Sequence, residues 1–161
     1  MKILFICHGN ICRSPMAEFY FRDLVARHHA APYFEIASCA TSSEEIWRGV
    51  GNPVYPPARA ELAKHGISCE GKRAMQLQRS DYAKYDLLIA MDTSNLRGIY
   101  RIIGSDPQNK VHRLLDYTPT GGDVADPWYT DRFDIAYADI VRGCDALWEA
   151  LCAENRSWKN L

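Results

Sequence analysis

Short apolar runs alternate with stretches of helical periodicity along the whole chain. Four runs, each bounded by polar or turn residues, are candidates for buried strands: Lys2–Ile6, Phe34–Ser38, Asp86–Met91 and Lys110–Leu115. Apolar residues recur at helical spacing over residues 15–29, 56–65, 93–103 and 131–154. Strands that alternate with helices pair in parallel through crossovers, so the pattern predicts an α/β fold, a doubly wound parallel sheet with helices on both faces.

The loop after the first run, in "FICHGNICRSP", has the composition of an anion site. Ligands of such sheets bind at the carboxyl ends of the strands, where this loop begins. Ser14 before a proline predicts a helix start with Ser14 as the N-cap, and the free amides of a helix N-terminus favour an anion. Gly9 and Asn10 tolerate the backbone angles that let the loop curl so that its amides converge on the anion. The guanidinium group of Arg13 can donate hydrogen bonds to two oxygens of a phosphate.

Cys7, the last residue of the apolar run, indicates a reaction rather than binding alone. A free thiol with a pKa of about 8.5 is only a few per cent ionised at pH 7. The amides, dipole and guanidinium that attract phosphate also stabilise a thiolate. Cys7 would then attack phosphorus while Arg13 and the amides hold the oxygens, and water would hydrolyse the phosphocysteine.

A phenolate leaving group needs a proton donor, for which Asp126 is the candidate. The proline that follows keeps Asp126 extended, and Trp128 and Tyr129 would form a slot for a flat ring. The same Asp-Pro dipeptide occurs at Asp106, where the sequence predicts a plain turn.

Composition narrows the class of protein further. The chain has 161 residues, which fits a single domain over 1–161. Its formal net charge of -1 argues against nucleic acid as a partner. We expect no membrane span and no signal peptide, so the six cysteines are expected in a reducing, cytoplasmic setting. Neither the cysteines nor the histidines have the spacing of a metal site.

The motif "FICHGNICRSPMAE" resembles the signature of the low-molecular-weight protein tyrosine phosphatases, and "DPW" resembles their second motif. The segments "ATSSEEI", "GNPVYPPARAEL", "HGI" and "MDTSNL" extend the resemblance over nearly the whole chain. It implies a four-stranded parallel sheet and hydrolysis of phosphotyrosine proteins and small aryl phosphates, without a cofactor. It implies Cys7 as the nucleophile, Arg13 as the phosphate-binding residue and Asp126 as the general acid. The implied phosphate-binding loop also contains His8, Gly9, Asn10, Ile11, Cys12 and Ser14.

Within this resemblance, Asn10 and Ser14 match residues that shape the loop and hydrogen-bond the thiolate, and Ser38 matches a supporting residue. Lys72 stands where many members have a supporting histidine, so the hydrogen bonds behind Asn10 are expected to differ. In members that share Cys12, oxidation links it reversibly to the nucleophile. The alternative for Cys12 is a small residue packed beneath the loop.

The sequence "WRGV" intervenes where the family usually passes quickly to Gly-Asn-Pro. Either Trp47 extends the aromatic slot and Arg48 favours acidic flanking sequence, or the segment is a surface excursion. We expect a monomer or a weak dimer.

Three other functions compete with this interpretation. An arsenate reductase needs a relay of two further cysteines, and none lies between Cys69 and Cys144. A protein-arginine phosphatase is expected to have threonine in the loop, where Ile11 favours aryl phosphates. A phosphate-binding or redox-sensing module without turnover has no use for Asp126.

Overall fold

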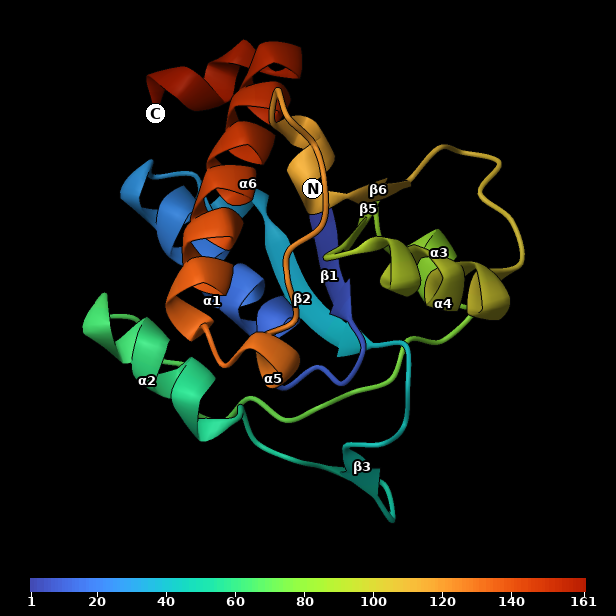
Figure 1. The fold of residues 1–161 in the computed structure, drawn as a ribbon. Coiled ribbons are helices and arrows are strands. Elements are labelled where there is room, and N and C mark those ends of the chain that lie inside the picture. Colours follow the sequence, from blue (N-terminus) through green and yellow to red (C-terminus); the bar gives the residue numbers. More distant parts are fainter.

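The computed structural model describes all 161 residues and has a four-stranded parallel sheet at its centre (Figure 1). Its strands, in the spatial order β2-β1-β5-β6, are β1 (Lys2–Cys7), β2 (Glu35–Ala40), β5 (Leu87–Ala90) and β6 (Val111–Arg113). The predicted fold class is confirmed. The hydrophobic pattern did not predict the hairpin of β3 (Ile46–Trp47) and β4 (Val50–Gly51), because two-residue strands have no periodicity to detect.

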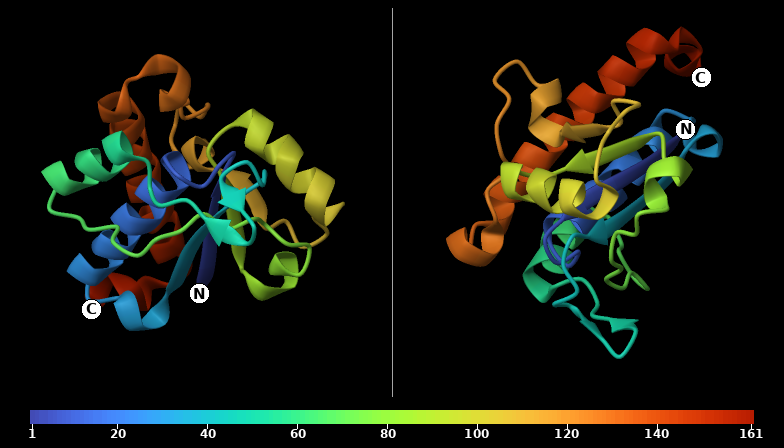
Figure 2. Two further views of the ribbon diagram at one scale, coloured as in Figure 1. Left: turned by 90° about the horizontal axis from the view of Figure 1, so that it is seen from below. Right: turned by 90° about the vertical axis from the view of Figure 1, so that its right-hand side faces the viewer.

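Helices cover both faces of the sheet (Figures 1 and 2). They are α1 (Arg13–Arg27), α2 (Pro56–Lys64), α3 (Asp81–Lys84), α4 (Thr93–Ile103), α5 (Pro127–Thr130) and α6 (Phe133–Glu154), with 3₁₀ turns at Ala31–Tyr33, Leu114–Tyr117 and Arg156–Asn160. The four long predicted helices are present; the one over 93–103 has the predicted bounds, and the ends of the other three differ from the prediction by at most two residues. The fourth predicted strand is shorter than expected, because its last two residues begin the second 3₁₀ turn.

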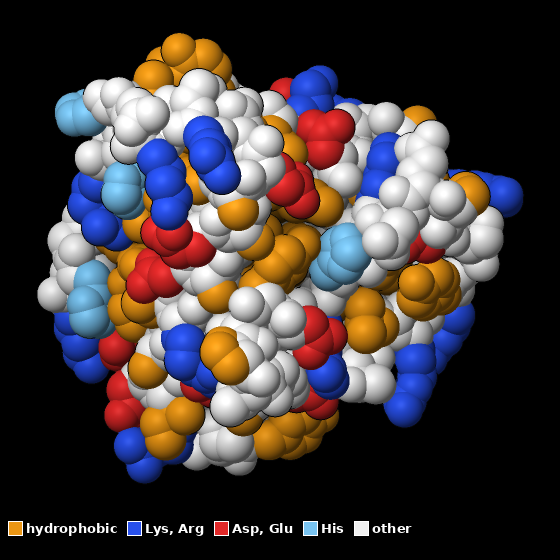
Figure 3. All heavy atoms as spheres, turned by 90° about the horizontal axis from the view of Figure 1, so that it is seen from above, with side chains coloured by type: hydrophobic (Ala, Val, Ile, Leu, Met, Phe, Trp, Pro, Cys, Tyr) orange, Lys and Arg blue, Asp and Glu red, His pale blue; other side chains and the backbone are white.

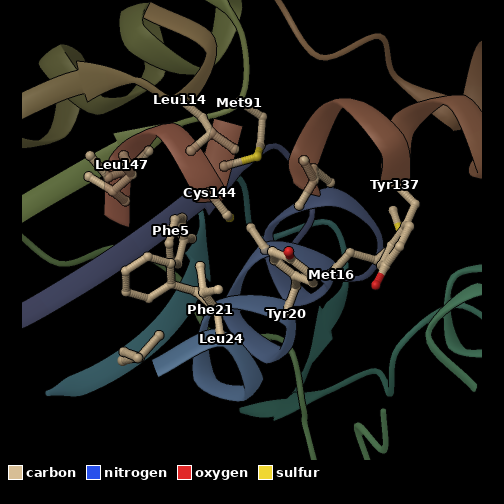
Figure 4. Close-up of a cluster of buried hydrophobic side chains, with 14 of the residues drawn as sticks. Phe5, Met16, Tyr20, Phe21, Leu24, Met91, Leu114, Tyr137, Cys144 and Leu147 are labelled. Carbon is tan, nitrogen blue, oxygen red and sulfur yellow. The ribbon is translucent and has the colours of Figure 1, made fainter. Parts of the chain in front are cut away.

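The central strand β1 is buried on both faces, and its side chains alternate between two cores. Ile3, Phe5 and Cys7 join the larger core with α1 and α6, whereas Leu4 and Ile6 join the smaller core with α4. Figure 4 shows side chains from β1, α1 and α6 converging in the larger core. This packing fixes the place where β1 ends.

The strand order reverses at β1, which places a crevice at the carboxyl ends of the strands. The chain passes from β1 to β2 on one side and later fills the other side with β5 and β6. Ile6 pairs with Ala90, so the loops after β1 and β5 leave the sheet next to each other. Ligands of doubly wound folds bind at such a switch point.

Charges of both signs are interspersed on the end of the molecule at which β1 begins, as Figure 3 shows. None of the helices combines the length and the apolar character that crossing a bilayer requires.

Candidate active site

A cavity of about 380 Å³ opens at the carboxyl end of β1. It is lined by Cys7, His8, Gly9, Ile11, Cys12, Arg13, Glu44, Glu45, Asp126, Trp128 and Tyr129. The fold therefore brings the predicted thiol, guanidinium and carboxyl together, although Asp126 is far from the first loop in the sequence. Glu44 and Glu45 are part of the wall that sequence reasoning did not identify.

The sulfur of Cys7 is held by two groups of its own loop. The backbone N–H of Asn10 donates to Sγ over 3.3 Å, and a 2.9 Å hydrogen bond joins Sγ to the hydroxyl of Ser14. The prediction that Ser14 caps the helix is wrong, since α1 begins at Arg13 and its N-cap is Cys12. Placed within the first turn of α1 instead, the Ser14 hydroxyl is free to contact the sulfur.

Asn10 is the left-handed residue that curls the loop, with a φ of 59°. Its side-chain amide donates to the hydroxyls of Ser14 (2.8 Å) and Ser38 (2.9 Å), and its Oδ1 accepts the N–H of Met75 (3.0 Å). Gly9 does not have a positive φ, contrary to expectation. A Cβ at Gly9 would lie 3.2 Å from Cγ of Glu45, so this position is short of space.

A buried charged pair closes the network behind the loop. The Ser38 hydroxyl donates to Oε1 of Glu18 (2.7 Å), and Nζ of Lys72 donates to the Ser38 carbonyl (2.8 Å) while lying 3.4 Å from the same Glu18 oxygen. Arg22 binds the other Glu18 oxygen at 2.8 Å. Sequence reasoning did not name Glu18, although it follows Ser14 by four residues and therefore shares its helix face.

Arg13 is buried between carboxylates at the base of the cavity. Its Nη1 donates to Asp92 (2.6 Å) and to the Val124 carbonyl (2.9 Å), and its Nη2 lies 3.4 Å from Asp126. Burial lowers the pKa of Arg13, but the charges of Cys7 and the two carboxylates outweigh it and raise the pKa above its usual value. Asp92 was also missed; its position directly after the strand Asp86–Met91, at the same sheet edge as Cys7, was the available signal.

Asp126 lies at the mouth of the cavity as the N-cap of α5. Its Oδ1 accepts the N–H of Trp128 (3.0 Å), which orients the carboxyl group. Trp128 packs against Tyr55 with ring centroids 5.4 Å apart, and Tyr129 is 85 % exposed at the rim. The side chain of Asp106, by contrast, accepts bonds that fix the start of β6.

At the rim of the cavity, two glutamates, each bonded to a neighbouring side chain, lie where a third aromatic residue was predicted. Glu44 contacts His8 at 2.9 Å, and Glu45 accepts the side-chain amide of Asn52 at 2.8 Å. Trp47 does not line the cavity; it is 74 % exposed on the hairpin with Arg48 over its ring at 5.7 Å. The predicted extension of the slot by Trp47 is therefore not found, and the segment is a surface excursion.

Cys12 and Cys7 line the same cavity, and both are buried. Burial, together with the negative charges at Cys7 and Asp126, raises the pKa of Cys12 to about 12. Cys12 therefore stays protonated at neutral pH. All six cysteines are free thiols, and no group of three or more His, Cys, Asp or Glu side chains is arranged to hold a metal ion.

A doubly wound sheet that gathers a thiol, a guanidinium and a carboxyl at its switch point agrees with the phosphatase class that the sequence predicts. The sequence model of the family "low molecular weight phosphotyrosine protein phosphatase" matches residues 2–157. The chain therefore belongs to the low molecular weight phosphotyrosine protein phosphatase family and is a phosphatase.

Relatives over the whole chain agree with this assignment. The low molecular weight protein-tyrosine-phosphatase YfkJ of Bacillus subtilis (strain 168) is 35 % identical over 158 residues, covering 97 % of this chain and 99 % of the relative. Its crystal structure superposes with a TM-score of 0.90 at 34 % identity over 96 % of both chains. The low molecular weight phosphotyrosine protein phosphatase of Rattus norvegicus is 38 % identical over 153 residues, covering 92 % of this chain and 94 % of the relative.

A Drosophila arginine phosphatase has a related structure, with a TM-score of 0.82 and 26 % identity over 94 % of this chain and 98 % of that one.

Proposed function

We propose that residues 1–161 are a single phosphatase domain that hydrolyses phosphotyrosine in proteins through a phosphocysteine on Cys7. The observation that carries this proposal is the environment of the Cys7 sulfur. The sulfur accepts the backbone N–H of Asn10, contacts the Ser14 hydroxyl and shares the cavity with Arg13, the first residue of a 15-residue helix. These donors favour a thiolate and a phosphate dianion alike.

In the first step, the Cys7 thiolate attacks phosphorus, and the P–S bond forms as the bond to the tyrosyl oxygen breaks. Arg13 and the loop amides hold the three non-bridging oxygens. Asp126 gives its proton to the leaving phenolate. In the second step, the Asp126 carboxylate takes a proton from water, which attacks phosphorus and releases inorganic phosphate and the thiolate. No metal or cofactor takes part.

The shape of the cavity supports an aryl substrate. Cys7 is buried at the base, whereas Trp128 and Tyr129 are exposed at the rim, so a phosphate must be carried inward on a long, flat side chain. Ile11 adds an apolar contact in the loop, where a phosphoguanidinium would need a polar one. Phosphotyrosine and small aryl phosphates meet these demands better than phosphoserine or phosphoarginine.

We also propose that Cys7 and Cys12 form a reversible disulfide. Peroxide would oxidise Cys7 to a sulfenic acid, and the Cys12 thiol would displace water from it, closing the disulfide. Support comes from their common cavity and from the protonated state of Cys12, which leaves Cys7 as the first site of oxidation. After inactivation by peroxide, dithiothreitol should restore the phosphatase activity of the wild type but not that of Cys12→Ser. Equal recovery of activity in both proteins would contradict the disulfide.

A substrate panel with a metal chelator present tests the main proposal. We expect hydrolysis of phosphotyrosine peptide and p-nitrophenyl phosphate, with little of phosphoserine or phosphoarginine. Cys7→Ser should be inactive yet folded by circular dichroism, while the matched variant Cys12→Ser retains most activity. Preference for phosphoarginine would instead assign an arginine phosphatase, and retained activity in Cys7→Ser would end the nucleophile assignment.

Two further expectations concern the setting of the enzyme. A reducing cytoplasm is supported by six cysteines without a disulfide among them. We also expect a monomer or a weak dimer, which sedimentation equilibrium can test. A stable higher oligomer at micromolar concentration would contradict this expectation.

A further inference from the structure

A second cavity, of about 680 Å³, opens beside the catalytic cavity. It lies between α2, the segment leading into α2 and the turn at residues 69–73, and Ile11 and Glu45 line both cavities. Figure 2 shows α2 at the same end of the molecule as the loop after β1. A peptide with its phosphotyrosine on Cys7 can therefore continue into this cavity without leaving the surface.

Two arginines line the second cavity without a carboxylate partner. Arg59 projects from α2 and forms no ion pair with any residue of the chain. The guanidinium of Arg73 reaches only the Gly51 carbonyl, over a long 3.4 Å hydrogen bond. Lys72 also lines the cavity, but its ammonium group is bonded to the Ser38 carbonyl behind the catalytic loop.

The carboxylates nearby leave these two cations free. Glu45 is engaged by the Asn52 side chain, and Glu70 is exposed and pairs with neither arginine. The remaining wall is largely apolar, formed by Ile11, Pro53, Val54, Tyr55, Pro56, Ala60 and Ala63. The cavity thus offers two unpaired guanidinium groups above an apolar wall.

We propose that this cavity binds an acidic segment of the phosphoprotein substrate that flanks the phosphotyrosine on one side. Arg59 and Arg73 bind its Asp or Glu carboxylates, because the planar guanidinium matches a carboxylate with two parallel hydrogen bonds. Glu44, which lines the catalytic cavity but not the second one, repels acidic residues placed elsewhere on the catalytic rim, so the preference is confined to the α2 side. The inference rests on the proposed phosphotyrosine activity and specifies its substrate class.

The test compares kcat/KM for matched phosphotyrosine peptides, each divided by the value for p-nitrophenyl phosphate with the same variant. The peptides carry two aspartates before the phosphotyrosine, two aspartates after it, two lysines in either place, or alanines throughout. We expect one aspartate peptide to exceed the alanine peptide by about three- to tenfold, the range of one or two ion pairs at a surface. Added salt should reduce that ratio.

Charge reversal then assigns the preference to the cavity. Arg59→Glu and Arg73→Glu should each remove the aspartate preference and favour the lysine peptide on the same side. Arg97→Glu, an exposed and unpaired arginine on α4, makes the same charge change and should leave the ratios unaltered.

Three results would overturn the inference: equal rates for the aspartate and alanine peptides, a lysine preference in the wild type, or the same change in Arg97→Glu. In each of these cases, retained hydrolysis of p-nitrophenyl phosphate would show that the proposed phosphatase activity still holds. Loss of activity on every phosphotyrosine substrate and on p-nitrophenyl phosphate would instead refute the proposed function itself.

Discussion

At the scale of single residues, Asp126 and Asp106 precede a proline alike, yet their surroundings differ. Asp126 caps a short helix at the mouth of the cavity, with one oxygen near Arg13. Asp106 accepts the Tyr82 hydroxyl and two backbone N–H groups. The Asp-Pro dipeptide is the same at both positions, so the surrounding contacts determine that only the Asp126 carboxylate is placed to contact a substrate.

This contrast predicts the effects of two matched substitutions. Asp126→Asn should lower kcat by about 10²- to 10⁴-fold, since general acid catalysis contributes that much. The loss should be larger for substrates with basic leaving groups, and vanadate binding should persist. Asp106→Asn should keep kcat within about twofold while lowering the melting temperature, because it removes charge-assisted hydrogen bonds. A leaving-group dependence unchanged by Asp126→Asn would contradict its role as proton donor.

Lys72 offers a second test at this scale. Its side chain is 9 % exposed and that of Glu18 3 % exposed, so Lys72→Met strips a buried carboxylate of one partner. The free energy of unfolding should fall by about 2 kcal/mol, less than for a fully orphaned charge because Arg22 remains. Since Ser38 and Asn10 are tied to this pair, alkylation of Cys7 by iodoacetate should slow as well.

Two variants separate that effect from general damage. Lys159→Met breaks a pair with Glu149 that is half exposed on both sides, and should cost well under about 1 kcal/mol. In Glu18→Gln/Lys72→Met both charges are gone, so part of the lost stability should return. A double variant no more stable than the additive sum would refute the pairing.

At the scale of elements, the hairpin of β3 and β4 supports the catalytic loop from outside the cavity. A Cβ on Gly51 would lie 1.9 Å from the Ala74 carbonyl oxygen, so the hairpin packs directly on that backbone. The next residue, Met75, donates its N–H to the Asn10 side chain. A displacement of the hairpin would therefore move Ala74 and Met75 and, through Met75, the side chain of Asn10 in the loop that holds the Cys7 sulfur.

Gly51→Ala should accordingly destabilise the protein by about 3 kcal/mol through overpacking and reduce kcat/KM for p-nitrophenyl phosphate. Gly49→Ala is the matched control at the hairpin tip. It has a φ of 77° and nothing within 4 Å, so it should cost about 1 kcal/mol of backbone strain without altering activity. Equal activity in both variants would show that the hairpin does not support the loop.

The elements also show what the sequence could and could not predict. β1 is a continuous apolar run and α6 has a long helical period, and the sequence predicts the ends of both within two residues. The N-cap was misassigned because Ser14 contacts the sulfur, a tertiary interaction that overrides its local preference. Only the family resemblance joined Asp126 to Cys7, since spacing carries no information over such a separation. The roles of Glu18 and Asp92 were not predicted, because they depend on contacts with residues far away in the sequence: Ser38 and Lys72 for Glu18, and Arg13 for Asp92.

At the scale of the whole molecule, the fold buries all six thiols without pairing any. Burial raises the pKa of Cys39 and Cys144 well above the usual value, with nearby acidic side chains adding to the effect, and the pKa of Cys12 reaches about 12. In the unfolded chain the same thiols ionise near pH 8.5. Below that pH both states keep their protons, whereas above it the unfolded state loses them first, so stability falls as the pH rises.

Cys144→Ala isolates one of these thiols. Each thiol that ionises only in the unfolded state contributes a slope of about -1.4 kcal/mol per pH unit to the free energy of unfolding. Urea unfolding between pH 9 and 10 should therefore show a slope shallower by about 1 kcal/mol per pH unit in Cys144→Ala than in the wild type. Leu147→Ala, in the same core, should lower the stability at every pH and leave the slope intact. Identical slopes in the wild type and Cys144→Ala would mean that the buried thiol ionises as readily in the folded protein as in water.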